Sequence, residues 1–141
     1  MGEAPPASGR FFYAEDSGLY RAFRDAWLAA HPDGESLGFL PSFRARGWFL
    51  TDLCPDPVDR LAPALRRAAR EAAEPRLART LRRLDPERVL VVVRAVLPNA
   101  RRAAAAAGWA GPLDVLSYPG RWTAHRRAFA RGLARILAAD G

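Results

Sequence analysis

The sequence predicts an α/β fold with a small parallel sheet. Three short apolar stretches, GWFLTDL, VLVVV and the segment 113–117, have the length and composition of buried strands. Longer segments with apolar residues at helical spacing separate them. Because alternating strands and helices are typical of a parallel sheet covered by helices, we expect a three-layer α/β/α sandwich.

Length and composition favour a single folded domain, 1–141. The 141 residues are half apolar and include four Trp and seven Phe, which excludes a disordered chain. No apolar run approaches the roughly 20 residues that span a bilayer, and the start has no signal-peptide pattern. Cys54 is the only cysteine, which excludes an internal disulfide and a multi-cysteine metal site. We expect a cytoplasmic protein.

The formal charge of +7 has two interpretations. Arginines that neutralise phosphates release counterions, so an excess of them favours a polyanionic partner such as DNA. Every residue of the Lys and Arg group is Arg, however, and Ala is abundant, as a GC-rich coding bias would produce. Both interpretations stay open.

The first half of the chain predicts one helix and one strand. Ser17 is a suitable N-cap, and apolar residues recur at helical spacing over 19–30. The helix should end at His-Pro-Asp-Gly, residues 31–34. A loop with several apolar residues, 37–43, then leads to a buried strand over 48–53.

The second half alternates helices with strands. An Arg/Ala/Leu helical region covers 58–84, with Pro75 expected to break it. The clearest buried strand, 89–93, is followed by an alanine-rich helix that ends near Gly108. After the strand at 113–117, a terminal helix is predicted over 123–138.

Three loops should meet at one edge of the sheet. Ligands of parallel sheets bind at the carboxyl ends of the strands, which here are followed by the loops TDLCPDP and SYPGRW. The opening stretch GEAPP has the small residues and the carboxylate of a loop of the same kind. These loops are the candidate site.

The ordered motifs resemble the uracil-DNA glycosylase superfamily. GEAPPASGRFF resembles its first motif, a Gly-Glu-Ala-Pro-type loop followed by Gly-Arg and Phe. FLTDLCP resembles the second strand, which ends in Thr-Asn before a proline-containing loop. VLVVVRAV takes the place of the third strand, and LSYPGRWTAHRRAF that of the last motif, commonly His-Pro-Ser. The set covers nearly the whole chain and implies a uracil-DNA glycosylase-like sandwich.

The resemblance implies roles for five residues. Glu3 takes the position of the acid that serves the sugar, and Tyr118 that of the histidine that supports the departing base anion. Phe12 or Phe11 takes the position of the aromatic that stacks on a flipped base. Asp52 takes that of the asparagine that reads the base edge. No cofactor and no metal are implied.

The same resemblance implies a DNA contact after the last strand. Arg121 and Trp122 belong to a loop that approaches the minor groove, where a Trp can wedge or stack and an Arg can bind phosphate. Arg10 belongs to the Gly-Arg of the first motif and is the third candidate for a DNA contact. Trp122 could equally pack the last helix onto the core, and His125 could lie on a solvated face or turn toward the pocket.

Two departures from the family pattern change the chemistry. An ionised aspartate only accepts hydrogen bonds, so Asp52 would suit a base edge with amino donors or would have to be protonated. Tyr118 donates one hydrogen bond but carries no positive charge, which weakens anion stabilisation by a few kcal/mol.

Each candidate also has a structural interpretation. Glu3 could be an exposed terminal residue, Asp52 a helix cap, and two of the three aromatics at 11–13 core residues. Cys54 is expected to be a buried, unreactive thiol, and the arginines over 60–83 a solvated face.

The strand expected before GEAPP is missing from the sequence. It is normally central in the sheet, so its absence would leave its neighbours unpaired. We therefore expect the natural protein to start upstream of Met1, or the sheet to have lost a member.

Three functional hypotheses follow. The first is a DNA-base glycosylase that hydrolyses the N-glycosidic bond of a deaminated or damaged base. The second is a non-catalytic member of the superfamily that binds nucleic acid. The third is an enzyme acting on a free nucleoside or small glycoside with Glu3 and Asp52. The expected partner is single- or double-stranded DNA, and we expect a monomer that binds no membrane.

Overall fold

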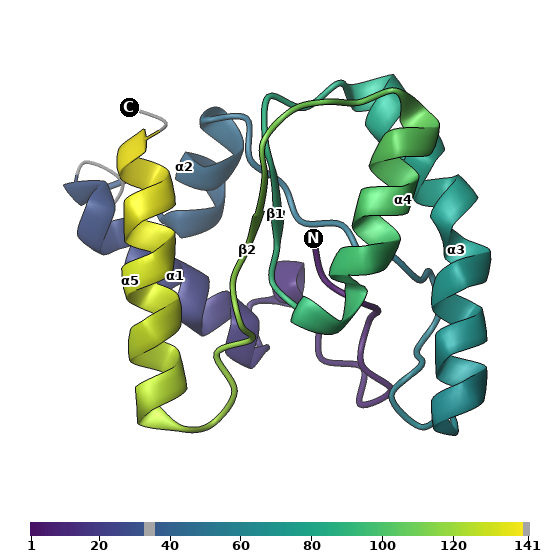
Figure 1. Ribbon diagram of the computed structural model, residues 1–141. Helices are drawn as coiled ribbons and strands as arrows, with labels where there is room; N and C mark the ends of the chain where they lie inside the picture. Colours follow the sequence, from purple (N-terminus) through teal and green to yellow (C-terminus); the bar gives the residue numbers. More distant parts are fainter. Residues whose placement is uncertain (33–35, 140–141) are drawn as a thin grey trace. The chain divides into compact units, whose positions relative to one another are not determined.

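The computed structural model describes residues 1–32 and 36–139 (Figure 1). It has the mixed α/β character that the sequence predicts, with a parallel sheet of two strands within the described residues. The chain forms two compact units, the first made of Met1–Gly9 and Thr51–Leu116 and the second of Arg10–Leu50 and Ser117–Gly141. That both belong to one domain stays a prediction.

A β–α–β arrangement forms the centre of the first unit. Strand β1 (Val89–Val91) pairs in parallel with β2 (Leu113–Val115), with Val91 opposite Val115. Between them, the short 3-10 turn η3 (Arg94–Val96) leads into helix α4 (Leu97–Ala107). The alanine-rich helix ends where expected, because Gly108 adopts the left-handed conformation that glycine tolerates best (φ 69°).

The first three residues extend this sheet. The Met1 amino group donates to the Leu90 carbonyl, and the Val92 N–H donates to the Met1 carbonyl over 3.0 Å. On the other side, Gly2 forms a parallel bridge with Asp52. Residues 1–3 therefore lie between β1 and residues 51–54, the position expected of the missing strand.

Helix α3 (Pro63–Leu84) packs against α4 and covers the core of the first unit. Its buried residues include Leu77 and Leu81, which belong to the same cluster as Leu53 and Val91. Pro75 lies inside α3 without ending it, contrary to the prediction. A proline removes one helical hydrogen bond. We attribute the unbroken helix to the apolar residues that anchor α3 beyond Pro75.

The second unit is helical with an aromatic core. Helix α1 (Gly18–Ala30) begins as predicted, with the Tyr20 N–H donating to the Ser17 hydroxyl over 3.1 Å. Helix α5 (Thr123–Ala139) packs on α1, where Phe23 and Phe129 stack edge-on with ring centres 5.3 Å apart. The terminal helix is thus confirmed, and the end of α1 at His31 agrees with the expected stop. Residues 33–34 of that stop lie outside the described residues.

Two predictions for residues 37–53 are wrong. The apolar loop 37–43 contains helix α2 (Phe39–Ala45), which buries Phe39 and Phe43, while the 3-10 turn η1 covers Phe12–Ala14. The strand expected over 48–53 is reduced to the single bridge at Asp52. The backbone N–H of Leu50 instead donates its hydrogen bond to a side chain, the Tyr13 hydroxyl, over 2.5 Å. This bond to a side chain takes the place of the backbone hydrogen bonds that a strand requires.

No helix in the described part of the chain is long and apolar enough to cross a membrane.

Candidate functional site

The parallel bridge between Gly2 and Asp52 brings two carboxylates to one edge of the first unit. The Gly2 N–H donates to the Thr51 carbonyl over 2.9 Å, and the Cys54 N–H donates to the Glu3 carbonyl over 2.7 Å. Glu3 and Asp52 are therefore on adjacent parallel segments. They are close enough for the charge of Glu3 to help raise the pKa of Asp52.

Glu3 is buried and doubly ion-paired. The residue is 8% exposed, and both carboxylate oxygens accept from arginines of α3. Arg66 donates from Nε to Oε1 over 2.8 Å and from its second nitrogen to Oε2, and Arg70 reaches Oε1 at 2.5 Å. Burial by itself would raise the pKa of Glu3, but the hydrogen bonds from Arg66 and Arg70 outweigh it and lower the pKa. Glu3 is thus held ionised.

Asp52 has the opposite environment. Burial raises its pKa, and the positive charges of the Met1 amino group and Arg76 only partly oppose this shift. Arg76 binds the backbone rather than the carboxylate, donating to the carbonyls of Asp52 and Leu53 over 2.9 and 3.0 Å. The pair therefore combines a firmly ionised Glu3 with an Asp52 that takes up a proton more readily than usual.

Cys54 follows on the same segment and is buried, as expected. Burial raises the pKa of its thiol, and the negative charge of Glu3 adds to this effect. The thiolate is the reactive form of cysteine, and this environment disfavours it at Cys54.

The arginines over 60–83 are not all the solvated face that the sequence predicts. Arg66 and Arg70 are four residues apart, so they lie on one side of α3 and bind Glu3 together, and Arg76 holds the segment 52–53. The i, i+4 spacing was visible in the sequence. Its partner Glu3 lies more than sixty residues away, so spacing alone could not identify it.

The two aromatic candidates differ in exposure. Phe12 is 3% exposed and surrounded by rings, with the Tyr13 and Phe23 ring centres 5.2 and 5.7 Å away. The ring of Phe12 therefore fills the core of the second unit, and its assignment to base stacking stays a prediction. Phe11 is 43% exposed and contacts Tyr13 edge-on, so it alone of the two presents a ring at the surface.

The loop before α5 carries the other predicted contacts. Pro119 is fully buried and Gly120 has a φ of 55°, which shapes the turn. Beyond it, Trp122 is 64% exposed, with the Arg121 guanidinium 5.7 Å from the centre of its ring. Tyr118, at the start of the loop, is 47% exposed. Trp122 does not pack into the core.

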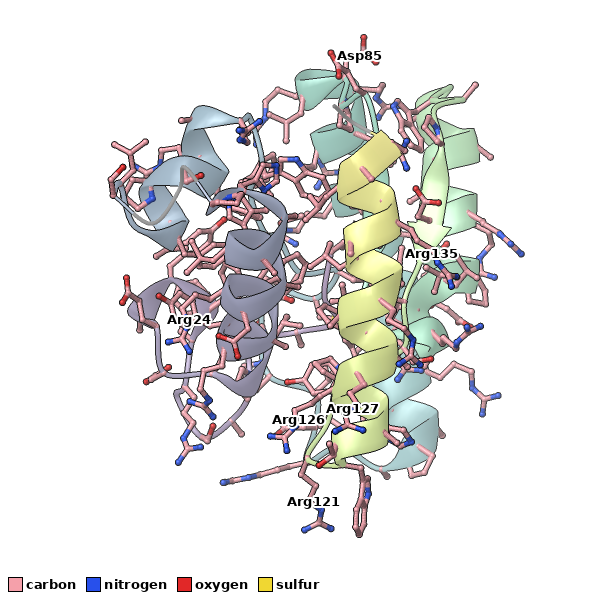
Figure 2. All side chains as sticks on the ribbon, turned by 90° about the vertical axis from the view of Figure 1, so that its left-hand side faces the viewer. Arg24, Asp85, Arg121, Arg126, Arg127 and Arg135 are labelled. Carbon is pink, nitrogen blue, oxygen red and sulfur yellow. The ribbon has the colours of Figure 1, made fainter. Side chains whose placement is uncertain are left out.

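Five arginines lie exposed on α5 and the loop before it. They are Arg121, Arg126, Arg127, Arg131 and Arg135. Figure 2 labels Arg121, Arg126, Arg127 and Arg135 among them. The sequence has no Asp or Glu from 115 to 139, and none of the five forms an ion pair within the described residues. We name this surface, with Trp122, the α5 surface. His125 is exposed beside it.

The predicted site residues thus fall on two units. Glu3 and Asp52 are brought together in the first, whereas Arg10, Phe11, Tyr118, Arg121 and Trp122 lie in the second. Arg10 is exposed. Within residues 1–32 and 36–139 no group of His, Cys, Asp and Glu side chains could hold a metal ion.

Comparison with models of protein families, with curated proteins and with solved structures finds no match to this chain.

Proposed function

We propose that this chain is a nucleic-acid-binding protein of uracil-DNA glycosylase-like architecture, and that it binds DNA through the α5 surface. The observation that carries the proposal is the run of five exposed arginines with no acid between 115 and 139. Such a surface neutralises phosphates and gains affinity from released counterions. An exposed Trp beside it adds the stacking element that nucleic-acid-binding proteins use.

The order of the extended segments supports the uracil-DNA glycosylase-like sandwich with three α/β/α layers. Residues 1–3 lie between residues 51–54 and β1, and β1 pairs with β2. This is the central position that the resemblance implies for the strand of the first motif. The location that goes with this proposal is the cytoplasm.

The binding function is preferred to catalysis because of Glu3. Each of its oxygens is bonded to a guanidinium, and two arginines surround one carboxylate, so the cluster carries a net positive charge. A positive cluster disfavours the cationic sugar that forms when an N-glycosidic bond breaks. A carboxylate whose pKa is lowered is also a poor base for activating water.

A DNA-base glycosylase is the second candidate function. The observation that favours it is the pairing of Glu3 with Asp52, two carboxyl groups with pKa values shifted in opposite directions at the carboxyl end of parallel segments. Two acids with separated pKa values are typical of hydrolytic sites. In that function Asp52 contacts the base.

One experiment separates the two functions. Binding of labelled DNA would be measured by fluorescence anisotropy, and base release by alkaline strand cleavage of oligonucleotides with uracil, hypoxanthine, xanthine or an alkylated base. The binding function predicts that the affinity for DNA depends on salt and that no base is released. It also predicts that a folded Glu3→Gln variant binds DNA with the wild-type affinity. Release of one base that Glu3→Gln abolishes would establish the glycosylase instead. Absence of DNA binding at low salt would contradict both.

A further inference from the structure

The arginines of α5 form a regular stripe along its exposed side. Arg127, Arg131 and Arg135 are spaced by four residues, so they follow one side of the helix with a rise of about 6 Å per step. The buried residues of α5 (Phe129, Leu133, Ile136 and Leu137) are at positions that face the opposite side. The stripe therefore presents three positive charges in a line, at intervals close to those between successive phosphates of an extended strand.

The exposed residues beside this stripe are small. Beyond the first turn, the other exposed positions of α5 are alanines, at 128, 134, 138 and 139. A helix that reads duplex DNA in the major groove combines Arg or Lys, which bind guanine, with side chains such as Asn and Gln, which bind adenine. The exposed side of α5 beyond its first turn offers arginines alone, and these bind the phosphates of any sequence.

Trp122 lies at the end of α5 from which the stripe runs. Its carbonyl accepts a hydrogen bond from the Arg126 N–H over 3.1 Å, which fixes it to the first turn of the helix. Arg121 lies over its ring, yet 64% of the residue stays exposed. An aromatic ring in this position offers a face on which a base can stack.

We infer that the α5 surface binds single-stranded DNA, with successive phosphates on Arg127, Arg131 and Arg135 and one unpaired base on Trp122. The inference rests on the proposed function and specifies its ligand. A base inside a duplex is stacked on its neighbours and reaches Trp122 only after they separate, whereas a base in a single strand is free to stack. The alanines beside the stripe fit the same ligand, because stacking and phosphate contacts need no Asn or Gln and tolerate any sequence.

The first test compares strands and charges. Anisotropy would be measured with a short single-stranded oligonucleotide, with the same sequence as a duplex and with its RNA counterpart, over a range of salt. We expect the single strand to bind at least about tenfold more tightly than the duplex. In the variant with Arg127, Arg131 and Arg135 all changed to Gln, the slope of log affinity against log salt should fall by about two.

A matched variant tests whether the stripe acts as a site. Arg67, Arg79 and Arg83 are exposed on α3, and changing all three to Gln removes the same charge from the first unit. We expect this variant to keep the wild-type salt slope. An equal decrease of the salt slope in both triple variants would overturn the inference, since the net charge of the protein would then explain binding.

The second test follows Trp122 directly. Of the four Trp residues, Trp27 is buried, Trp48 and Trp109 are half-buried and Trp122 is exposed. Stacking on DNA should quench the fluorescence of Trp122, and Trp122→Ala should abolish this quenching. The same variant should bind DNA roughly ten- to hundredfold more weakly. Trp122→Phe, which keeps a ring, should retain most of the affinity.

The outcomes distinguish this inference from the proposed function. Duplex binding as tight as single-strand binding, or affinity unchanged in Trp122→Ala, would overturn the inference and leave the proposed DNA binding intact. RNA bound more than tenfold more tightly than DNA would overturn the assignment of DNA. Binding to none of the three oligonucleotides would contradict the proposed function as well.

Discussion

Gly2 and Asp52 face each other across a parallel bridge, and a Cβ atom placed on Gly2 would collide with the Asp52 carboxylate. The first glycine of GEAPP is therefore required by the side chain on the neighbouring segment, not by an unusual backbone angle. Because Gly2 has no side chain, the Asp52 carboxylate fits directly beside it. The same contact links the loop GEAPP to the loop TDLCPDP.

Gly2→Ala should destabilise the protein by about 1–3 kcal/mol, because the added methyl group forces Asp52 or the backbone to move. Urea unfolding measures the change. Gly18→Ala is the matched control, since no atom lies within 4 Å of a Cβ there and the residue begins α1. We expect the control to be neutral or slightly stabilising. Equal losses in both variants would show that the Asp52 contact does not constrain Gly2.

Glu3→Gln should destabilise by about 2–4 kcal/mol at neutral pH, because it leaves Arg66 and Arg70 partly buried without a counter-charge. Thermal unfolding measures this loss. Glu74→Gln is a useful comparison, since Glu74 pairs with the exposed Arg102 and should contribute less.

The stability of the wild-type protein should also depend on pH through Glu3. Its pKa is lowered in the folded state, so the unfolded chain binds the proton more readily. The stabilisation from Glu3 is present above the unfolded pKa of about 4.3 and is lost as pH falls below it. The stability of Glu3→Gln should not show this decrease at acidic pH. An identical dependence of stability on pH in the two proteins would contradict the ion-pair account.

Asp52→Asn should stabilise the protein at neutral pH by about 1 kcal/mol, since burial disfavours the charged aspartate. A raised pKa means that Asp52 destabilises the fold as pH rises through that pKa. The difference between Asp52→Asn and wild type should therefore shrink in acid, as Asp52 becomes protonated in both states. Chemical unfolding at pH 7 and at pH about 4 measures this. A variant less stable than wild type at pH 7 would refute the prediction.

Pro75→Ala should raise stability by about 1–3 kcal/mol, because alanine restores the backbone donor that proline removes from the interior of α3. The melting temperature measures the gain. Ala72→Pro, at another exposed position of α3, should produce the opposite change. No gain in Pro75→Ala would show that the helix is already adapted to its proline.

Local signals in the sequence were sufficient for several elements. The Ser17 cap, the apolar run at β1, the end of α4 at Gly108 and the helix α5 all depend on neighbouring residues, and each is confirmed. The strand over 48–53 failed because a strand needs a partner along its length. Only Asp52 and its neighbours have one, in residues 1–3.

The candidate site was less predictable because its contacts are long-range. That Glu3 and Asp52 follow adjacent segments could be expected from the order of the motifs. The binding of Glu3 by Arg66 and Arg70 could not, since Arg79 and Arg83 of α3 have the same spacing. Phe11 and Phe12 are adjacent and chemically identical, so their separation into surface and core became visible only in the packed aromatic cluster.

The distribution of tryptophans gives each unit its own spectroscopic reporter. Trp109 belongs to the first unit, where its indole N–H donates to the Pro86 carbonyl over 2.8 Å, whereas Trp27, Trp48 and Trp122 belong to the second. In a variant with Trp109 as the sole tryptophan, emission follows the first unit, and in Trp109→Phe it follows the second. Coincident melting curves would mean that the two units unfold as one cooperative body, and separated curves that each unfolds on its own.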